Sequence, residues 1–166
     1  MFGQFSLPQH TKIVDASAGP VTTNGGVTFD YVSLKNVVKA WIIIQLTQAV
    51  GHATVINPKQ ATAVAGTSAK DFTAARGLPI LWLNEDTAAT DTLVKQTDAA
   101  TLTVTNNVKK KLAIIEIDPA KLDVTNGFDV LGCTISDSSQ ATNFVSAVYV
   151  LMERYAQATP PAAITD

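Results

Sequence analysis

Two histidines, His10 and His52, are the only side chains in this sequence whose ordinary pKa suits a general base near neutral pH. Nucleophilic catalysis by a Ser-His-Asp or Cys-His group needs such a base, held firmly beside the nucleophile. His10 follows Pro8-Gln9 in an apparent N-terminal arm, and His52 follows Gly51 in a predicted turn. No Gly-x-Ser-x-Gly sequence accompanies either histidine. We therefore expect no catalytic residue, and we expect that the chain is not an enzyme.

The acidic segment Asn84-Glu85-Asp86, followed by Asp91, is the best candidate for a metal site. Hard cations such as calcium bind several oxygens on one loop, but the DxDxDG spacing and a closing glutamate are missing here. Glu116 and Asp118 alternate along a predicted strand and share one face, as carboxylates on a solvated strand face also do. We expect polar loop and surface roles for these residues, and neither a metal nor a cofactor.

Charge and cysteine content restrict the function further. The formal net charge is −2, and Lys109-Lys110-Lys111 is the one basic cluster, so we expect a solvated turn there and no nucleic-acid partner. The single cysteine, Cys133, lies in a predicted strand and is expected to be a small buried apolar residue. The first eight residues lack the pattern of a signal peptide, and no apolar run is long enough to span a membrane. The sequence indicates a soluble protein made in a reducing cytoplasm.

Trp41 and Trp82 have a flat surface that could stack on a sugar ring, which would make the chain a carbohydrate-binding module. Both tryptophans, however, lie inside aliphatic runs, Trp41-Ile42-Ile43-Ile44 and Leu81-Trp82-Leu83. This setting favours core packing of both rings.

The composition is that of one all-β domain. The chain has 166 residues, of which 46% are hydrophobic and 16% charged, which excludes disorder and suits a single sizeable core. Thr, Val, Ile and Ala dominate short apolar runs that Gly, Pro, Asn and Asp interrupt. This pattern predicts a two-sheet β-sandwich. The predicted strands are Phe29–Lys35, Ala40–Thr47, Ala53–Ile56, Pro79–Asn84, Thr92–Gln96, Thr101–Thr105, Lys111–Ile117, Phe128–Ile135 and Asn143–Tyr155.

Turn residues separate these strands. Thr23-Asn24-Gly25-Gly26, Asn57-Pro58 and Thr125-Asn126-Gly127 predict turns, and Asp118-Pro119 predicts a turn or one turn of helix. The segment Lys59–Lys70 is expected to be a loop or an irregular strand pair.

The last apolar run fits two periods. Phe144, Val148 and Tyr155 fall on one face at helical spacing, while the stiff side chains of Val145 and Val150 and the surrounding β pattern favour a strand. We predict a strand that leads into an extended C-terminal arm, because Pro160 and Pro161 lack an N–H and disfavour helix. The expected divisions are 1–28, an N-terminal arm and lead-in; 29–156, the sandwich; and 157–166, the extended C-terminal arm.

Several strings resemble those of the capsid decoration, or cement, proteins of tailed bacteriophages. They are residues 39–48, Asn84-Glu85-Asp86 with Asp91-Thr92-Leu93-Val94, Ile117-Asp118-Pro119-Ala120, Asn126-Gly127-Phe128-Asp129 and residues 154–161. The likeness extends over most of the chain from Phe29 onward and contains no mechanistic motif.

This resemblance implies a jelly-roll-like sandwich that forms a homo-oligomer, a dimer or trimer. The protein would sit on the outer capsid surface of a virion and bridge neighbouring copies of the major capsid protein through many weak contacts made at once. It would be made in the cytoplasm of the host bacterium. Other virion parts, namely tail tube, connector or fibre, stay open, as does a carbohydrate-binding module.

Apolar or extended residues of the two arms are the predicted contact residues, because an extended arm can add a strand to a neighbour's sheet edge. They are Phe2, Phe5, Leu7, Pro8, Tyr155, Pro160, Pro161 and Ile164.

Overall fold

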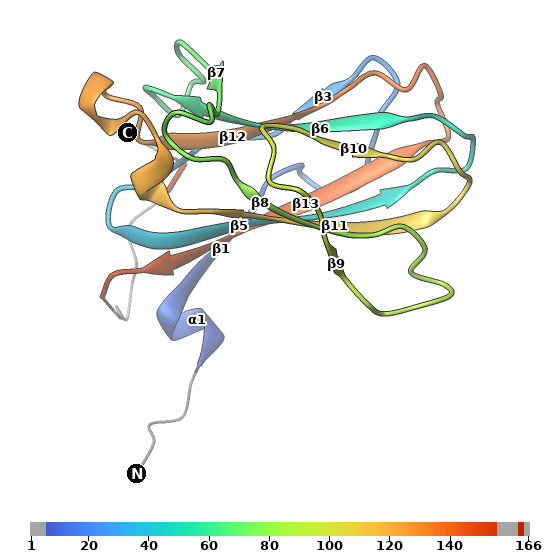
Figure 1. Ribbon diagram of the computed structural model, residues 1–166, viewed down its shortest axis with the longest axis horizontal. Coiled ribbons are helices and arrows are strands. Elements are labelled where there is room, and N and C mark those ends of the chain that lie inside the picture. Colours follow the sequence, from blue (N-terminus) through green and yellow to red (C-terminus); the bar gives the residue numbers. More distant parts are fainter. Residues whose placement is uncertain (1–5, 156–162, 165–166) are drawn as a thin grey trace.

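The computed structural model describes residues 6–155 and 163–164 of the chain, which fold into an all-β sandwich of two antiparallel sheets. Figure 1 shows the sheets as a lower and an upper layer. The lower sheet has the order β1-β13-β5-β11-β8-β9, with β2 also on β13, and the upper has the order β10-β6-β12-β3, with β4 on β12 and β7 on β6. This confirms the predicted fold class, and from β10 onward each strand crosses to the other sheet, a jelly-roll-like connectivity.

The elements have the following bounds: α1 Leu7–His10, β1 Thr11–Asp15, β2 Val21–Thr22, β3 Val27–Thr28, β4 Val32–Ser33, β5 Val37–Thr47, β6 Thr54–Ala61, β7 Lys70–Asp71, β8 Ile80–Asn84, β9 Val94–Lys95, β10 Leu102–Val104, β11 Lys110–Ile117, the 3-10 turns η1 Pro119–Lys121 and η2 Val124–Asn126, β12 Val130–Ile135 and β13 Phe144–Glu153.

The core lies between the two sheets and is built from alternate residues of each long strand. Ile42 and Ile44 of β5, Ile115 of β11 and Ile56 of β6 are fully buried. Successive side chains of a strand point to opposite faces, so the residues between these face away from the core. The same alternation therefore defines an inner and an outer face for every strand of the lower sheet.

The last apolar run is a strand, as predicted. β13 pairs with β5 along its length and with β1 and β2 on its other side, which places it inside the lower sheet. Tyr149 of β13 points inward, is fully buried and donates a 2.7 Å hydrogen bond from its hydroxyl to the backbone carbonyl of Asp30. Because neighbouring strands pair with this run on both sides, it is a strand, and the helical spacing that the sequence also allowed is not used.

Some predicted boundaries were wrong. Asn57-Pro58 is not a turn, because β6 continues through it to Ala61 and pairs Pro58 with Cys133 of β12. On the side away from β12, the partner of β6 changes at this point from β10 to β7. Among the described residues no strand pairs with Pro58 on that side, so a proline here leaves no hydrogen bond of that ladder unmade. The predicted strand Phe29–Lys35 is reduced to the short β4, and Thr92–Gln96 to β9.

The predicted N-terminal segment takes part in the sandwich. β1 pairs with β13, so the lead-in before residue 29 supplies an edge strand of the lower sheet. Leu7 and Pro8 lie in the single helical turn α1 rather than in an extended arm, and Pro8 suits the first turn because its missing N–H has no helical partner there. Phe2 and Phe5 lie outside the described residues.

At the other end of the chain, Ala163 packs against its own sandwich. Its carbonyl accepts a 2.7 Å hydrogen bond from the backbone N–H of Ser33, and only 6% of the residue is exposed. Its neighbour Ile164 is exposed, as is Tyr155 just after β13. Pro160 and Pro161 lie outside the described residues. Ala163 therefore contacts its own domain, whereas the sequence predicted an arm that reaches away from it.

Candidate functional site

The outward side of the lower sheet is apolar across five neighbouring strands. We call it the outer apolar face and define it by Ile13, Trp41, Ile43, Trp82, Ile114, Val148 and Val150. The strand register places these residues opposite one another: Ile43 lies between Val148 and Ile114, and Ile114 lies opposite Trp82. They are half-buried or exposed, and Ile13 has 51% of its surface exposed. The sandwich thus leaves an apolar sheet face uncovered by its own core.

Two shallow hollows lie side by side on this face and share Ile43. The first, of about 380 Å³, is lined by Trp41, Ile43, Trp82, Leu93, Ile114, Glu116 and Val150. The second, of about 480 Å³, is lined by Ile13, Asp15, Ser17, Gly19, Ile43, Gln45 and residues 146–148. Both hollows are open to solvent. The first offers almost no polar atoms, and this suits an apolar partner surface better than a sugar, whose hydroxyls need several hydrogen-bonding groups.

Glu116 is the acid on the outer apolar face, and both of its oxygens have partners. Trp82 Nε1 donates a 2.6 Å hydrogen bond to Oε1, and Lys39 Nζ lies 3.2 Å from Oε2. Burial alone would raise the pKa of Glu116, but the hydrogen bonds from Trp82 and Lys39 lower it below its ordinary value. The carboxylate is therefore ionised near neutral pH, and Lys39 balances its charge within the same face.

The prediction that both tryptophans belong to the core was wrong. Trp41 and Trp82 are half-buried and lie on the outer apolar face, since the alternation of β5 sends Ala40 and Ile42 inward and Trp41 outward. The sequence around each tryptophan did not indicate this outward direction, because the neighbouring residues on both faces of the strand are apolar and none marks the outer side.

The outward side of the upper sheet is different in character. Lys59 and Asp71 form an ion pair there, Asn57 hydrogen-bonds to the same carboxylate, and Thr103 is exposed. Charged and polar side chains are usual on a solvated sheet face. The two outer faces of the sandwich are thus unequal, and only the lower one is apolar.

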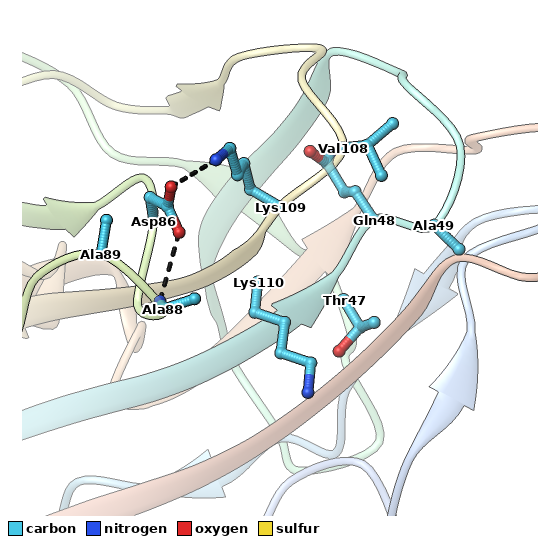
Figure 2. Close-up of a pocket in the computed structure, with 9 residues that line it drawn as sticks. All are labelled: Thr47, Gln48, Ala49, Asp86, Ala88, Ala89, Val108, Lys109 and Lys110. Carbon is cyan, nitrogen blue, oxygen red and sulfur yellow. Dashed lines mark hydrogen bonds and ion pairs between the residues drawn. The ribbon is translucent and has the colours of Figure 1, made fainter.

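An open groove of about 570 Å³ lies at one end of the sandwich, between the end of β5, the start of β11 and the loop after β8 (Figure 2). Asp86 in this groove accepts hydrogen bonds from Lys109 Nζ and from the backbone N–H of Ala88. Lys110 points away from Asp86, on the side of Thr47. The acid nearest the groove is thus already paired with a lysine of its own chain.

The lysine cluster is only in part the solvated turn that the sequence predicted: Lys109 and Lys110 are exposed, but Lys111 is not. Lys109 pairs with Asp86, and Lys111 is fully buried on the inner side of β11. The Lys111 ammonium lies 2.9 Å from Glu85 Oε2 and donates to the carbonyl and hydroxyl of Thr105. Of the three lysines, only Lys110 is exposed and has no acidic partner among the described residues. The cluster and the acidic segment predicted as loop residues therefore neutralise each other.

No group of three or more metal-ligating side chains occurs among residues 6–155 and 163–164. Cys133 is fully buried, as predicted, and burial raises the pKa of its thiol well above the ordinary range, so the reactive thiolate does not form. His10 lies in α1 with Nδ1 2.8 Å from the Ser6 carbonyl, and His52 lies in the turn before β6.

Asp123, which immediately precedes the turn η2, is a carboxylate with several charged and polar partners. Lys70 Nζ lies 2.6 Å from one oxygen and the Arg76 guanidinium 2.7 Å from the other, and Asn126 donates to both. The Lys70 ammonium also sits 3.6 Å from the centre of the Phe128 ring. The cluster fastens the segment around β7 to the turn η2.

These partners make the Asp123 cluster sensitive to acid. The hydrogen bonds from Lys70 and Asn126 lower the pKa of Asp123 below its ordinary value. Its stabilising effect is complete above the unfolded-state pKa, near 4, and is lost as the pH falls through the lower pKa of the folded state. Urea unfolding at pH 7 and pH 3 should show that Asp123→Asn is less stable at pH 7 and loses less stability on acidification than the wild type. Equal losses in both proteins would contradict this assignment.

The sequence reasoning looked for contact residues in the two arms and missed the outer apolar face. The signal that could have found this face is the run of apolar residues with no alternation in β5 and β13, which is typical of strands covered on both sides. Of the predicted contact residues, Leu7, Pro8, Tyr155 and Ile164 are exposed, but none belongs to the outer apolar face as defined.

Comparison with protein-family models and with curated proteins gives no match for this chain. Among the described residues, no helix has the length and apolar content needed to cross a membrane. Fold and surface chemistry therefore carry the functional argument.

Proposed function

We propose that this chain is a structural virion protein that decorates the outer surface of a tailed-phage capsid and stabilises it by bridging major capsid protein subunits. The observation that carries the proposal is the outer apolar face, whose size and chemistry suit association between protein subunits of an assembly, copies of this chain included, rather than a reaction or a small polar ligand. The resemblance of the sequence to capsid decoration proteins gives the partner its identity.

The contacts of the described residues support a role in assembly. Three of the candidate acids, Glu85, Asp86 and Glu116, are each neutralised by a lysine of the same chain. Burying a paired charge of this kind against a protein surface costs less desolvation free energy than burying a free charge, because the paired charge keeps its counter-charge when water leaves. Bridging would add several such contacts at once, so that weak individual contacts give firm attachment only where neighbouring capsid subunits are already assembled.

Binding to assembled shells tests the proposal. The purified chain should co-sediment with empty shells assembled from the major capsid protein of the same phage, and should not bind that capsid protein before assembly. Absence of binding to the shells would contradict the capsid role.

A carbohydrate-binding module is the second candidate, and the position of Trp41 and Trp82 on an open hollow is the observation that favours it. Stacking of sugar rings on these side chains would shift tryptophan fluorescence saturably when host polysaccharide is added. Because the hollow is almost devoid of polar groups, we expect no such shift. A saturable shift would favour the carbohydrate-binding module over the capsid role.

A further inference from the structure

The central strands of the lower sheet have a composition that one chain alone does not explain. β5 carries Trp41 and Ile43 outward as well as Ile42 and Ile44 inward, and β11 and β13 are similarly apolar on both sides. Strands that read as continuous apolar runs are those buried on both faces of a sheet. The core covers the inner face, and residues 6–155 and 163–164 supply no second layer on the outer apolar face, although its composition is typical of a covered face.

The outer apolar face is large enough for a stable dimer. The five neighbouring strands range from five residues in β1 and β8 to eleven in β5. At a mean length of about eight residues and a spacing of about 4.8 Å, they give a sheet face of roughly 600 Å² before side-chain relief is counted. A standard protein interface buries about 800 Å² on each partner. Isolated monomers seldom leave an apolar patch larger than about 300–600 Å² in water. The face is thus at the limit of what a monomer exposes and close to what one half of a dimer buries.

The distribution of polar groups also fits an interface. The centre of the face, around Ile43 and Val148, is apolar, and Gln45, Thr47 and Lys110 lie toward one end of the same strands. An apolar centre with a polar rim is the usual anatomy of a dimer contact. The ion pair between Lys39 and Glu116 carries no net charge. The other charged residues named on this side, Asp15 and Lys110, have opposite signs, so two copies of this face would not repel each other through an excess of one charge.

We propose that a second copy of this chain packs on the outer apolar face, so that two lower sheets stack face to face about a two-fold axis with Ile43 near the centre of the contact. Two apolar sheet faces with the same twist stack about 10 Å apart, as in a sandwich. A two-fold contact uses the same patch on both subunits, so the outer apolar face of each chain is covered by that of the other and the dimer is closed. The use of this dimer as the bridging unit rests on the function proposed above, whereas the dimer itself does not.

Light scattering on the purified full chain tests the pairing. We expect twice the chain mass of 17.5 kDa for the wild type. Ile43→Lys places an unpaired charge in the centre of the contact and should weaken dimerisation at least about 100-fold. Val55→Lys is the matched control, because Val55 is also a β-branched, half-buried residue, opposite the exposed Thr103 on the outward side of the upper sheet. This control should stay dimeric.

A second variant and a second readout guard against loss of folding in Ile43→Lys. Ile13→Lys changes a more exposed position on the edge strand β1, so the monomer should tolerate it, while the dimer should be weakened. The two tryptophans of the chain both lie on the outer apolar face, so intrinsic fluorescence reports on this face alone. Acrylamide should quench it weakly in the wild type and strongly in folded Ile43→Lys or on dilution.

The outcomes separate this inference from the capsid role. A wild-type chain that is monomeric at tens of micromolar, or a dimer that Val55→Lys breaks and Ile43→Lys and Ile13→Lys do not, overturns the face-to-face pairing. A monomer that still binds capsid shells would overturn the dimer and leave the capsid role standing. A wild-type dimer that Ile43→Lys breaks but that does not bind shells would support the face-to-face pairing and overturn the capsid role.

Discussion

Replacing Lys111 with alanine should lower the free energy of unfolding by about 3 kcal/mol, because it breaks a buried ion pair and leaves a cavity. The Lys111 side chain has no exposed surface, and its ammonium pairs with Glu85 and donates to Thr105. Burial alone would raise the pKa of Glu85, but the hydrogen bonds from Lys111 and Thr105 lower it below its ordinary value. One third of the Glu85 side chain is exposed, so water replaces part of what the lysine provided and the loss stays near the lower end for buried pairs.

The matched variant Lys111→Met separates charge from packing. Methionine fills most of the space of the lysine stem, so this variant should lose about half as much stability as Lys111→Ala. Adding Glu85→Gln to Lys111→Met should recover part of that loss, since no buried carboxylate is then left without a cation. Urea unfolding monitored by circular dichroism measures all variants, at one protein concentration because a dimer links stability to concentration. A loss below about 0.5 kcal/mol for Lys111→Ala, as at an ordinary surface position, would contradict the assignment.

The sequence alone was sufficient to predict where the long strands lie, but not which side chains of these strands point toward the core. The β-branched runs of β5, β11 and β13 predict strands whichever way they face, and the structure confirms all three. A run such as Trp41-Ile42-Ile43-Ile44 has no polar residue to mark the solvent side, and a shift of one residue exchanges the two faces. The neighbouring strands decide the direction through register, which is a property of the tertiary fold. The position of Trp41 and Trp82 could therefore not be read from their neighbours.

The same limit explains the lysine cluster and the acidic segment. Each was read as a polar surface segment because charged residues adjacent in sequence are usually solvated. In the structure, the alternation of β11 turns Lys111 inward while Lys110 stays outside. Glu85 comes from the loop after β8, and β8 pairs with β11. Strand pairing thus joins two segments that are more than twenty residues apart, and no local pattern predicts such a pairing.

Gly132 of β12 is the position where the smallest substitution should have a large effect. A Cβ added there would lie 2.3 Å from Cε1 and 2.4 Å from Cδ1 of Tyr31, much closer than carbon atoms approach. Gly66, whose φ is +74°, also lies close to this ring, since a Cβ added at Gly66 would be 2.9 Å from Cε2 of Tyr31. The ring is thus held between β12 and the loop after β6. Gly132→Ala should displace the ring and lower the free energy of unfolding by about 2 kcal/mol.

A double-mutant cycle with Tyr31→Ala tests whether the ring is the cause. Without the ring, the three atoms that lie nearest to the added methyl group are gone, and alanine is better than glycine inside a strand because it loses less backbone entropy on folding. Gly132→Ala should therefore cost less than about 0.5 kcal/mol in the Tyr31→Ala background, which gives a coupling energy of more than about 1 kcal/mol between the two positions. An equal cost in both backgrounds would show that the backbone of β12, rather than Tyr31, requires the glycine. Because Tyr31 covers the upper sheet, this substitution should leave the proposed dimer contact on the lower sheet intact, and light scattering on the folded variant checks that independence.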